Sequence, residues 1–157
     1  MAQEIERKYL LDPAVLAHPT LHKYKADNII QAYLCRDVFD IRARITNDDF
    51  GSFCIKHGKG VVRNEYEYEV PVTDAEEIIA VCGNMVQKKR YYIVDGGSSN
   101  HIFELDEYFA NNAGLVTLEV ELLGETELIV FPDWLASFVV EEVTGNKKYS
   151  NSTLAYN

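Results

Sequence analysis

The segment Val61–Val72 reads VVRNEYEYEVPV, and its charged and apolar side chains alternate with a period of two. One side of this alternation carries charge, and the other is aromatic or aliphatic: Arg63, Glu65, Glu67 and Glu69 against Tyr66, Tyr68 and Val70. Successive side chains of a β-strand point to opposite faces of the sheet. The segment is therefore predicted to be a strand with one charged and one apolar face.

The same alternation extends through most of the chain. It predicts seven further strands, at Gln3–Leu11, Lys23–Leu34, Val38–Asn47, Ser52–Gly58, Val86–Asp95, His101–Phe109 and Leu115–Gly124. Turns rich in Gly, Asn or Asp separate many of them. Helical spacing of apolar residues predicts short helices at Pro13–Ala17, Ala75–Cys82 and Pro132–Glu142. This pattern favours an α+β, mainly β fold, either an antiparallel barrel or a strongly curved sheet.

Length and charge limit the classes of protein that fit. The chain has 157 residues without a linker or repeat, so we expect one domain over residues 1–157. Asp and Glu number 25 against 15 Lys and Arg, a formal net charge of -10. Nucleic-acid binding and docking on anionic membranes both depend on basic surfaces, so neither is expected.

The expected location is the cytoplasm. The N-terminus is charged from Glu4 onward, unlike a secretory signal, and no apolar stretch is long enough to span a bilayer. Three cysteines without C-x-x-C spacing predict free thiols in a reducing compartment rather than a disulfide framework or a zinc site.

Charged residues recur two apart on six of the predicted strands, and each strand tends to favour one sign. Besides the segment at Val61–Val72, they include Glu4, Glu6 and Lys8; Arg42 and Arg44; Lys88 and Arg90; Glu104 and Asp106; and Glu119 and Glu121. Two interpretations follow. The charges can form the solvated outer face of a one-sided sheet, or they can line the wet, ligand-filled interior of a barrel.

Both signs on one wall have a chemical use. Arg and Lys bind phosphate oxygens, with Arg offering a planar fork, while clustered carboxylates bind Mg²⁺ or Mn²⁺. Together these groups suggest a polyphosphate ligand held by cationic side chains and divalent metal. Phosphoryl transfer depends mainly on positioning and charge neutralisation, so no Ser or Cys nucleophile is needed.

The pentapeptide Glu4–Lys8 resembles the E-x-E-x-K signature of the CYTH superfamily, the triphosphate tunnel metalloenzymes. Further similar motifs follow in the same order: Gln31-Ala32-Tyr33-Leu34, Arg42-Ala43-Arg44, Lys56, Arg63-x-Glu65-x-Glu67, Lys88-Lys89-Arg90-Tyr91, Glu104-Leu105-Asp106, Glu119-Val120-Glu121, and Val143-Thr144-Gly145 through Tyr149-Ser150-Asn151. The resemblance spans Glu4 to Leu154. It implies an eight-stranded antiparallel closed β-barrel, a triphosphate tunnel with a few flanking helices.

The resemblance also implies roles for individual residues. Mg²⁺ or Mn²⁺ is expected on Glu4, Glu6, Glu119 and Glu121. The triphosphate is expected on Lys8, Arg42, Arg44, Lys56, Arg63, Lys88, Arg90 and Lys148. Further tunnel acids are Glu65, Glu67 and Asp106, whereas Glu104 fits a surface position equally well. Lys8 and Tyr33 are expected beside the reacting phosphate, with Lys8 as an electrostatic helper or a water-positioning group.

Short bacterial members of this superfamily suggest hydrolysis of inorganic triphosphate to diphosphate and phosphate, and of other triphosphates, by metal-assisted attack of water. A class IV-type adenylate cyclase forming cyclic AMP from ATP is the first alternative. A non-catalytic polyphosphate- or nucleotide-binding module is the second. The superfamily also makes a homodimer plausible.

Overall fold

The computed structural model of the protein describes residues 2–36, 39–59, 62–94 and 101–157. These residues form nine strands: β1 (Ala2–Leu11), β2 (Ala26–Arg36), β3 (Phe39–Thr46), β4 (Phe50–Lys59), β5 (Val62–Val70), β6 (Met85–Val94), β7 (Ile102–Tyr108), β8 (Val116–Glu121) and β9 (Val139–Glu142). The prediction of a mainly β fold is confirmed. The strand ends predicted at Val38, Val61 and Asp95 lie outside the described residues.

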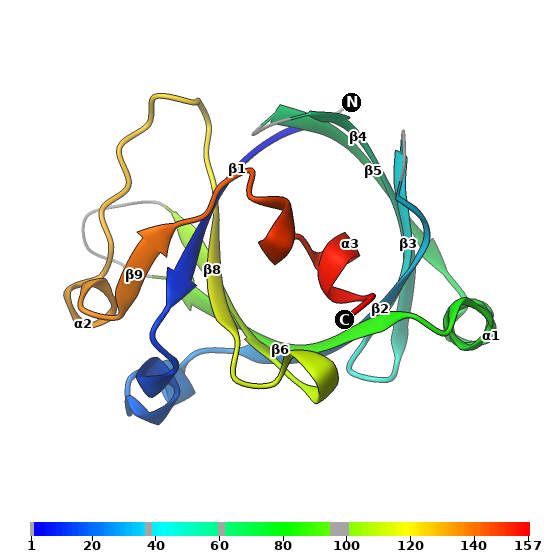
Figure 1. The fold of residues 1–157 in the computed structure, drawn as a ribbon, viewed down its shortest axis with the longest axis horizontal. Coiled ribbons are helices and arrows are strands. Elements are labelled where there is room, and N and C mark those ends of the chain that lie inside the picture. The colour runs from blue at the N-terminus through cyan, green and yellow to red at the C-terminus, as the bar shows by residue number, and fades with distance from the viewer. Residues whose placement is uncertain (1, 37–38, 60–61, 95–100) are drawn as a thin grey trace.

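All the strands belong to one antiparallel sheet in the order β5-β4-β3-β2-β6-β7-β8-β1-β9. An additional pairing joins Ala2–Ile5 of β1 to Val62–Glu65 of β5, at the other end of this order. The sheet is strongly curved, and its strands surround a common interior (Figure 1). The predicted alternation therefore separates an inner from an outer face.

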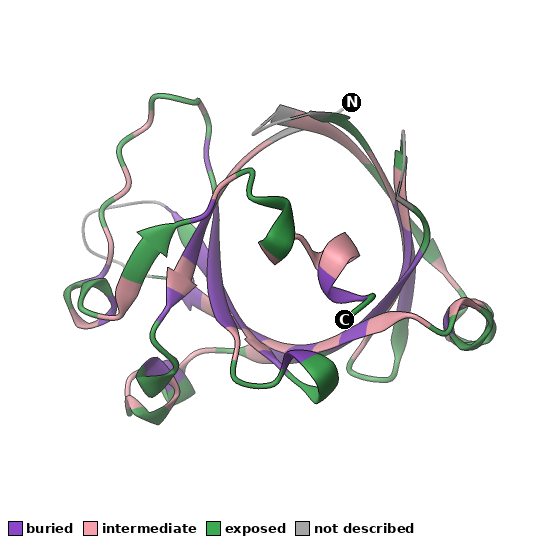
Figure 2. Cartoon of the chain, in the orientation of Figure 1, coloured by how far each residue is buried: buried purple, intermediate pink, exposed green. Residues whose placement is uncertain are grey.

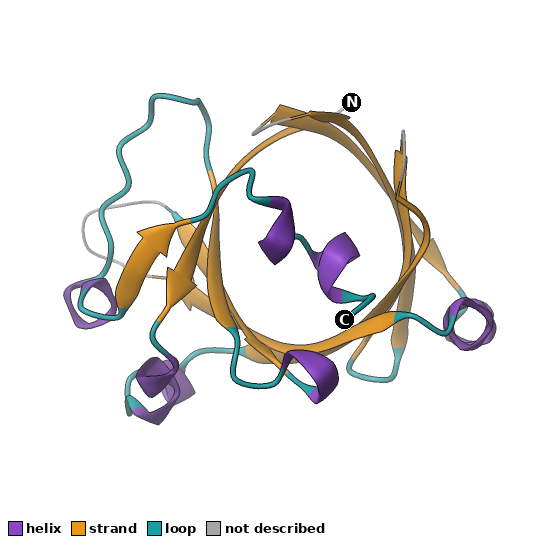
Figure 3. Ribbon diagram, viewed as in Figure 1, coloured by secondary structure: helices purple, strands orange, loops and turns teal. Residues whose placement is uncertain are grey.

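Apolar residues of the outer face pack under the helices. The main apolar cluster includes Tyr9, Leu105 and Leu118, and it contains Val15 of the 3₁₀-helix η1 (Pro13–Ala17), Leu21 of η2 (Leu21–Lys23) and Leu135 of α2 (Asp133–Ala136). A second cluster joins α1 (Val72–Cys82) to β2 and β3. Figure 3 shows these helices outside the ring of strands. The ion-paired residues of the alternation lie on the inner face, which supports the second interpretation.

The C-terminal segment lies across the interior. It comprises η4 (Lys147–Tyr149) and α3 (Asn151–Leu154). A hydrogen bond connects it to η3 (Ala110–Asn112), because Asn112 Nδ2 donates to the Leu154 carbonyl over 2.9 Å. Leu154 and Ala155 pack against Tyr33, Val86 and Tyr108. Figure 2 shows that most of η4 is exposed whereas part of α3 is buried. One end of the interior is therefore apolar.

The predicted helix Pro132–Glu142 is wrong beyond Ala136. The helix α2 ends there, and Val139–Glu142 forms β9, which pairs with Tyr9–Leu11 of β1. Two β-branched valines begin this strand, and β1 offers them a free backbone edge, so sheet pairing overrides the helical spacing. The spacing of Trp134, Leu135 and Phe138 reflected burial in the main apolar cluster instead.

The other helices agree with expectation. The predicted helix Ala75–Cys82 lies within α1, which begins earlier, after Pro71, and ends at Gly83 with φ 70°. Strand β2 begins at Ala26 rather than Lys23, because Leu21–Lys23 forms η2.

Cys35, Cys54 and Cys82 are free thiols. Within the described ranges, none of the helices has the length and apolar character needed to cross a membrane.

Candidate functional site

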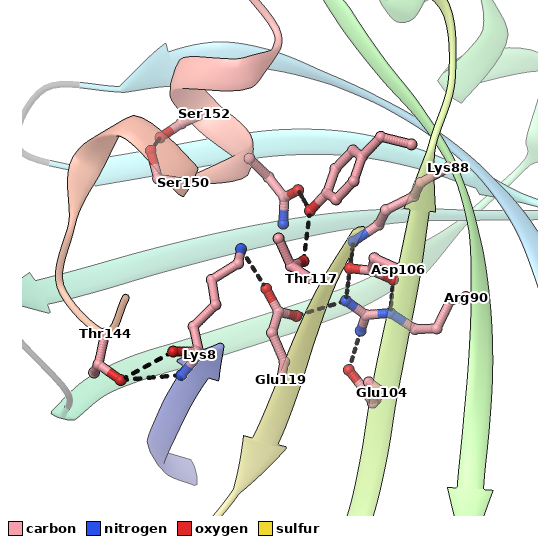
Figure 4. Close-up of polar contacts among 12 residues, drawn as sticks. Lys8, Lys88, Arg90, Glu104, Asp106, Thr117, Glu119, Thr144, Ser150 and Ser152 are labelled. Carbon is pink, nitrogen blue, oxygen red and sulfur yellow. Dashed lines mark hydrogen bonds and ion pairs between the residues drawn. The ribbon is translucent and has the colours of Figure 1, made fainter. Parts of the chain in front are cut away.

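A first group of ion pairs lines the inner face of β1, β6, β7 and β8 (Figure 4). Asp106 is central: its carboxylate accepts from Lys88 Nζ over 2.6 Å and from Arg90 Nε and NH2 over 2.7 Å each. Glu119 accepts from Lys8 Nζ over 2.7 Å and from Arg90 NH2 over 2.6 Å. Arg90 NH1 also donates to Glu104, so Glu104 belongs to this group rather than to the outer surface. Three cations and three carboxylates are thus connected.

Sheet register brings these residues together. Lys8 lies directly opposite Glu119, and Arg90 lies directly opposite Asp106. Cross-strand neighbours on one face have Cβ atoms about 5 Å apart, which suits an ion pair between long side chains. The backbone of Lys8 is fixed as well, because its N–H donates to Thr144 Oγ1 over 3.0 Å. The group is therefore held by backbone pairing, and ligand binding is not needed to assemble it.

Burial and neighbouring charges shift the pKa values of this group in opposite directions. Burial would lower the pKa of Lys8, but the Glu119 carboxylate raises it well above its usual value. Burial and the Arg90 guanidinium together lower the pKa of Lys88 to about 7. Burial would raise the pKa of Glu119, but Lys8 and Arg90 hold it well below its usual range. Lys8 is thus a permanent cation, whereas the pKa of Lys88 lies near neutral pH.

A second group lies on β3, β4 and β5. Glu65 accepts from Arg42 NH2 over 3.3 Å, pairs with Lys56 Nζ over 3.0 Å, and accepts from Cys54 Sγ over 2.8 Å. Further along the same two strands, β4 and β5, Ser52 Oγ donates to Glu67 over 2.9 Å. Burial, with the adjacent Glu65, raises the pKa of the Cys54 thiol to about 12, so Cys54 is a neutral donor.

Gln31 and Tyr33 lie on β2, the strand between the two groups, and Arg44 lies on the adjacent strand β3. Arg44 Nε donates to Gln31 Oε1 over 3.1 Å, and Gln31 Nε2 donates to the Tyr33 hydroxyl over 3.1 Å. Burial and the like charges of Arg42 and Arg90 lower the pKa of Arg44 to about 10. Burial raises the pKa of Tyr33 above its usual value. Tyr33 is therefore a neutral hydroxyl at neutral pH.

The four acids predicted as metal ligands have different surroundings. Glu6 and Glu121 are direct partners in the β1–β8 register, so their side chains share the inner face. Glu119 turns toward Lys8 and Arg90. The side chain of Glu4 lies outside the described part of the structure. Among the side chains that are described, no three Asp, Glu, His or Cys groups converge on one metal position.

Two predicted phosphate ligands lie apart from the ion-paired groups. Arg63 NH1 pairs with Asp40 over 3.9 Å, toward one end of β5. Lys148 is exposed on η4, with its Nζ 5.3 Å from the centre of the Tyr149 ring. Neither side chain contacts the first group within the described residues.

Some inward residues were missed from sequence. Gln31, Ser52, Cys54 and Tyr108 all lie two or four residues from a predicted site residue on the same strand. Their place in the alternation carried the signal, but neutral side chains do not stand out in a search for charged pairs. Tyr108 donates to Asn151 of α3 over 2.8 Å, which links the inner wall to the C-terminal segment.

A strongly curved antiparallel sheet with paired cations and carboxylates on its inner face defines a β-protein built to bind a polyanion. A relative named inorganic triphosphatase, from Acetivibrio thermocellus, is 35% identical over 164 residues, covering 100% of this chain and 96% of the relative. The chain therefore belongs to the inorganic triphosphatase family of the CYTH superfamily, the triphosphate tunnel metalloenzymes.

A solved structure of another inorganic triphosphatase supports this family assignment. The inorganic triphosphatase NE1496 matches with a TM-score of 0.68 and 30% identity, over 100% of this chain and 97% of that one. A protein from Hippeastrum, described as a putative adenylyl cyclase with a dominant triphosphatase activity, matches with a TM-score of 0.56 and 18% identity, over 77% of this chain and 80% of that one. The second likeness concerns the fold alone. A comparison with models of known protein families finds no match.

Proposed function

We propose that the protein hydrolyses inorganic triphosphate to diphosphate and phosphate in a metal-dependent reaction within its charged interior. One observation carries the proposal beyond family membership. Six cations from four strands share the inner face, and they are Lys8, Arg42, Arg44, Lys56, Lys88 and Arg90. So many cations on one buried wall suit a small, highly charged anion, because Coulomb interactions strengthen away from bulk water.

In this proposal the interior acts as a closed eight-stranded tunnel within a single domain spanning residues 1–157. The pairing of β1 with both β8 and β5 supports it, since it connects the eighth strand of the order back to the first. A ring without an open edge would hold the cations at fixed separations. The substrate would then meet a wall that is already organised, which lowers the cost of reorientation during reaction.

Hydrolysis would require a water oxygen to form a bond with a terminal phosphorus while the bridging P–O bond to diphosphate breaks. Arg42, Arg44, Lys56, Lys88 and Arg90 would neutralise the phosphate oxygens, with Arg63 and Lys148 nearer the ends. Lys8 stays a cation because Glu119 raises its pKa, so it would donate to a phosphate oxygen or the attacking water rather than take a proton. Tyr33 would donate a hydrogen bond from its neutral hydroxyl to a phosphate oxygen.

We propose that Glu4, Glu6, Glu119 and Glu121 hold Mg²⁺ or Mn²⁺, with Glu65, Glu67 and Asp106 as supporting acids. The donor chemistry fits, because these hard cations prefer carboxylate oxygens. The direct pairing of Glu6 with Glu121 fits as well, since it places two carboxylates side by side on the inner face. A bound divalent ion would stabilise negative charge on the phosphoryl oxygens.

The test is a substrate panel. Purified protein receives tripolyphosphate, ATP, thiamine triphosphate or diphosphate with Mg²⁺ or Mn²⁺, and both phosphate release and cyclic AMP are followed. We expect turnover of tripolyphosphate. Its absence with both metals would overturn the proposal. Cyclic AMP formation from ATP would favour the cyclase alternative, and binding without turnover would favour the binding module.

A variant tests the acidic residues separately. Glu6→Gln removes one charge from the Glu6–Glu121 pair and should lower metal-dependent turnover by about a hundredfold or more, the loss typical when one transition-state charge contact is removed. Glu125→Gln, in an exposed loop, is the matched control and should keep full activity. Equal activity of the two variants would show that Glu6 has no part in the reaction.

A further inference from the structure

Arg44 differs from the other cations of the inner wall. Lys8, Arg42, Lys56, Lys88 and Arg90 each form an ion pair with a carboxylate. Within the described part of the chain, Arg44 forms none, and its hydrogen-bond acceptor is the neutral amide oxygen of Gln31 at 3.1 Å. A phosphate arriving at the other cations has to compete with a resident carboxylate. At Arg44 it does not.

Gln31 is held in one orientation. Its side chain is fully buried, and its residue lies directly opposite Arg44 in the β2–β3 register. Oε1 accepts from Arg44 while Nε2 donates to Tyr33, so reversing the amide would turn its NH₂ group toward the guanidinium and lose both hydrogen bonds. The amide thus fixes Arg44, and it also makes the Tyr33 oxygen an acceptor. The Tyr33 proton is then directed to another partner.

The charge around Arg44 favours an anion. Arg42 belongs to one ion-paired group and Arg90 to the other, and with burial their like charges lower the pKa of Arg44. Arg44 therefore lies where cations of both groups converge. A glutamate at position 31 would have nearly the same shape as glutamine and would neutralise Arg44 permanently. The amide adds no negative charge beside Arg44, which Glu67 offsets only from beyond ion-pair distance.

We propose that Gln31 is a positioning residue that keeps Arg44 free of a resident carboxylate, which makes Arg44 the first contact for a phosphate of the substrate. The inference rests on the proposed triphosphatase function, and it adds an order of events. The anion docks at Arg44 before it displaces the carboxylates bound to the neighbouring cations. Docking at Arg44 should therefore occur without divalent metal.

Calorimetry with metal-free tripolyphosphate tests the docking step apart from turnover. Gln31→Glu should weaken this binding about tenfold or more, the cost expected when a hydrogen-bonded charge loses its ligand. Gln31→Met, which orients Arg44 less well but adds no charge, should weaken it less. Gln87→Glu, at a half-exposed position on the neighbouring strand β6 opposite Ile30, is the matched control and should stay within about twofold, as substitutions outside buried networks usually do.

Steady-state kinetics with Mg²⁺ supply a second measurement. Gln31→Glu should raise KM while leaving kcat nearly unchanged, because docking contributes equally to the ground state and the transition state. A merely structural role would lower the melting temperature and the amount of active protein without this split. If Gln31→Glu does not fold, Gln31→Met and Arg44→Met are combined. The double variant should bind no worse than Arg44→Met alone.

Equal metal-free affinity of the wild type and Gln31→Glu would overturn the inference, as would additive losses in the double variant. Failure of the proposed function looks different. In that case the wild type does not turn over tripolyphosphate with any metal, whatever the effect of Gln31 on binding.

Discussion

At the scale of single residues, Asp106 is the carboxylate on which the first ion-paired group depends. Its side chain is fully buried, and it accepts one hydrogen bond from Lys88 and two from Arg90. Removing one partner of a buried ion pair leaves the other charge without compensation. The group is therefore both a binding surface and a source of instability if one member is lost.

The first prediction concerns that dependence. Asp106→Asn should lower the free energy of unfolding by about 3 kcal/mol or more at neutral pH, measured by urea denaturation. The control is Glu107→Gln on the same strand but the opposite face, which should change stability by less than about 0.5 kcal/mol. If both variants are equally stable, the ion pairs of Asp106 do not form in solution.

A second prediction follows from Lys88. Its pKa of about 7 in the folded protein lies below the value of about 10.4 expected after unfolding. Between these values the unfolded chain binds more protons than the folded one, so Lys88 makes the free energy of unfolding rise with pH across this range. As pH falls toward 7, the free energy of unfolding therefore decreases, because the unfolded chain takes up a proton at Lys88 more readily than the folded one.

Urea denaturation at pH 7, 8 and 9 measures this slope. Lys88→Met should flatten it, because the substituted side chain does not titrate. Lys89→Met, on the outer face of the same strand, removes a lysine without touching Asp106 and should keep the wild-type slope. Parallel curves for the wild type and Lys88→Met would contradict the assignment.

At the scale of elements, the backbone of the turn between β5 and α1 packs closely against Gly51 of β4. A Cβ atom at Gly51 would lie 2.9 Å from the Val70 carbonyl oxygen and 3.1 Å from Val72 Cα, both of them backbone atoms. Backbone cannot rotate away as a side chain can. The close approach of α1 to the sheet therefore requires glycine at this position.

Gly51→Ala should accordingly lower the free energy of unfolding by about 2 kcal/mol, the range typical of overpacking. Gly124→Ala is the matched control, since a Cβ there meets nothing within 4 Å, and its stability should be near that of the wild type. Chemical denaturation of both variants measures the difference. An equally stable Gly51→Ala would mean that α1 can move outward at little cost.

Elements also show what could be predicted from sequence. Alternation located all eight long strands, and on six of them one face carries a charged pair. It also identified the charged pairs that form the ion-paired groups. It did not find β9, because four residues are too short to show a period and their pairing with β1 is a tertiary effect. Gln31 lies in the motif Gln31-Ala32-Tyr33-Leu34, but the sequence indicates no role for it, since its role depends on Arg44 directly across from it in the sheet.

At the scale of the whole molecule, the inner apolar cluster around Leu154 joins the C-terminus to β2, β6 and β7. Trp134, a residue of α2, packs against the main apolar cluster on the outer face. If residues 1–157 form one cooperative unit, as we propose, then a change at Leu154 must be felt at Trp134 as well.

The fourth prediction tests this cooperativity. Leu154→Ala should lower the free energy of unfolding by about 2–4 kcal/mol, the cost of truncating a buried leucine. Trp134 fluorescence and far-UV circular dichroism should report the same shifted midpoint. Val81→Ala, at an exposed position on α1, should shift neither probe. Separate midpoints for the two probes would indicate two independent folding units.

The pairing of β1 also constrains the order in which the protein folds. Lys8 contacts Glu119 and Thr144, which follow it by 111 and 136 residues. During synthesis β1 leaves the ribosome before its partners β5, β8 and β9, which emerge much later. Until then both of its edges stay open to unwanted pairing, and such long-range contacts make folding slow. Of the nine strands described, the one made first is among the last to complete its pairing.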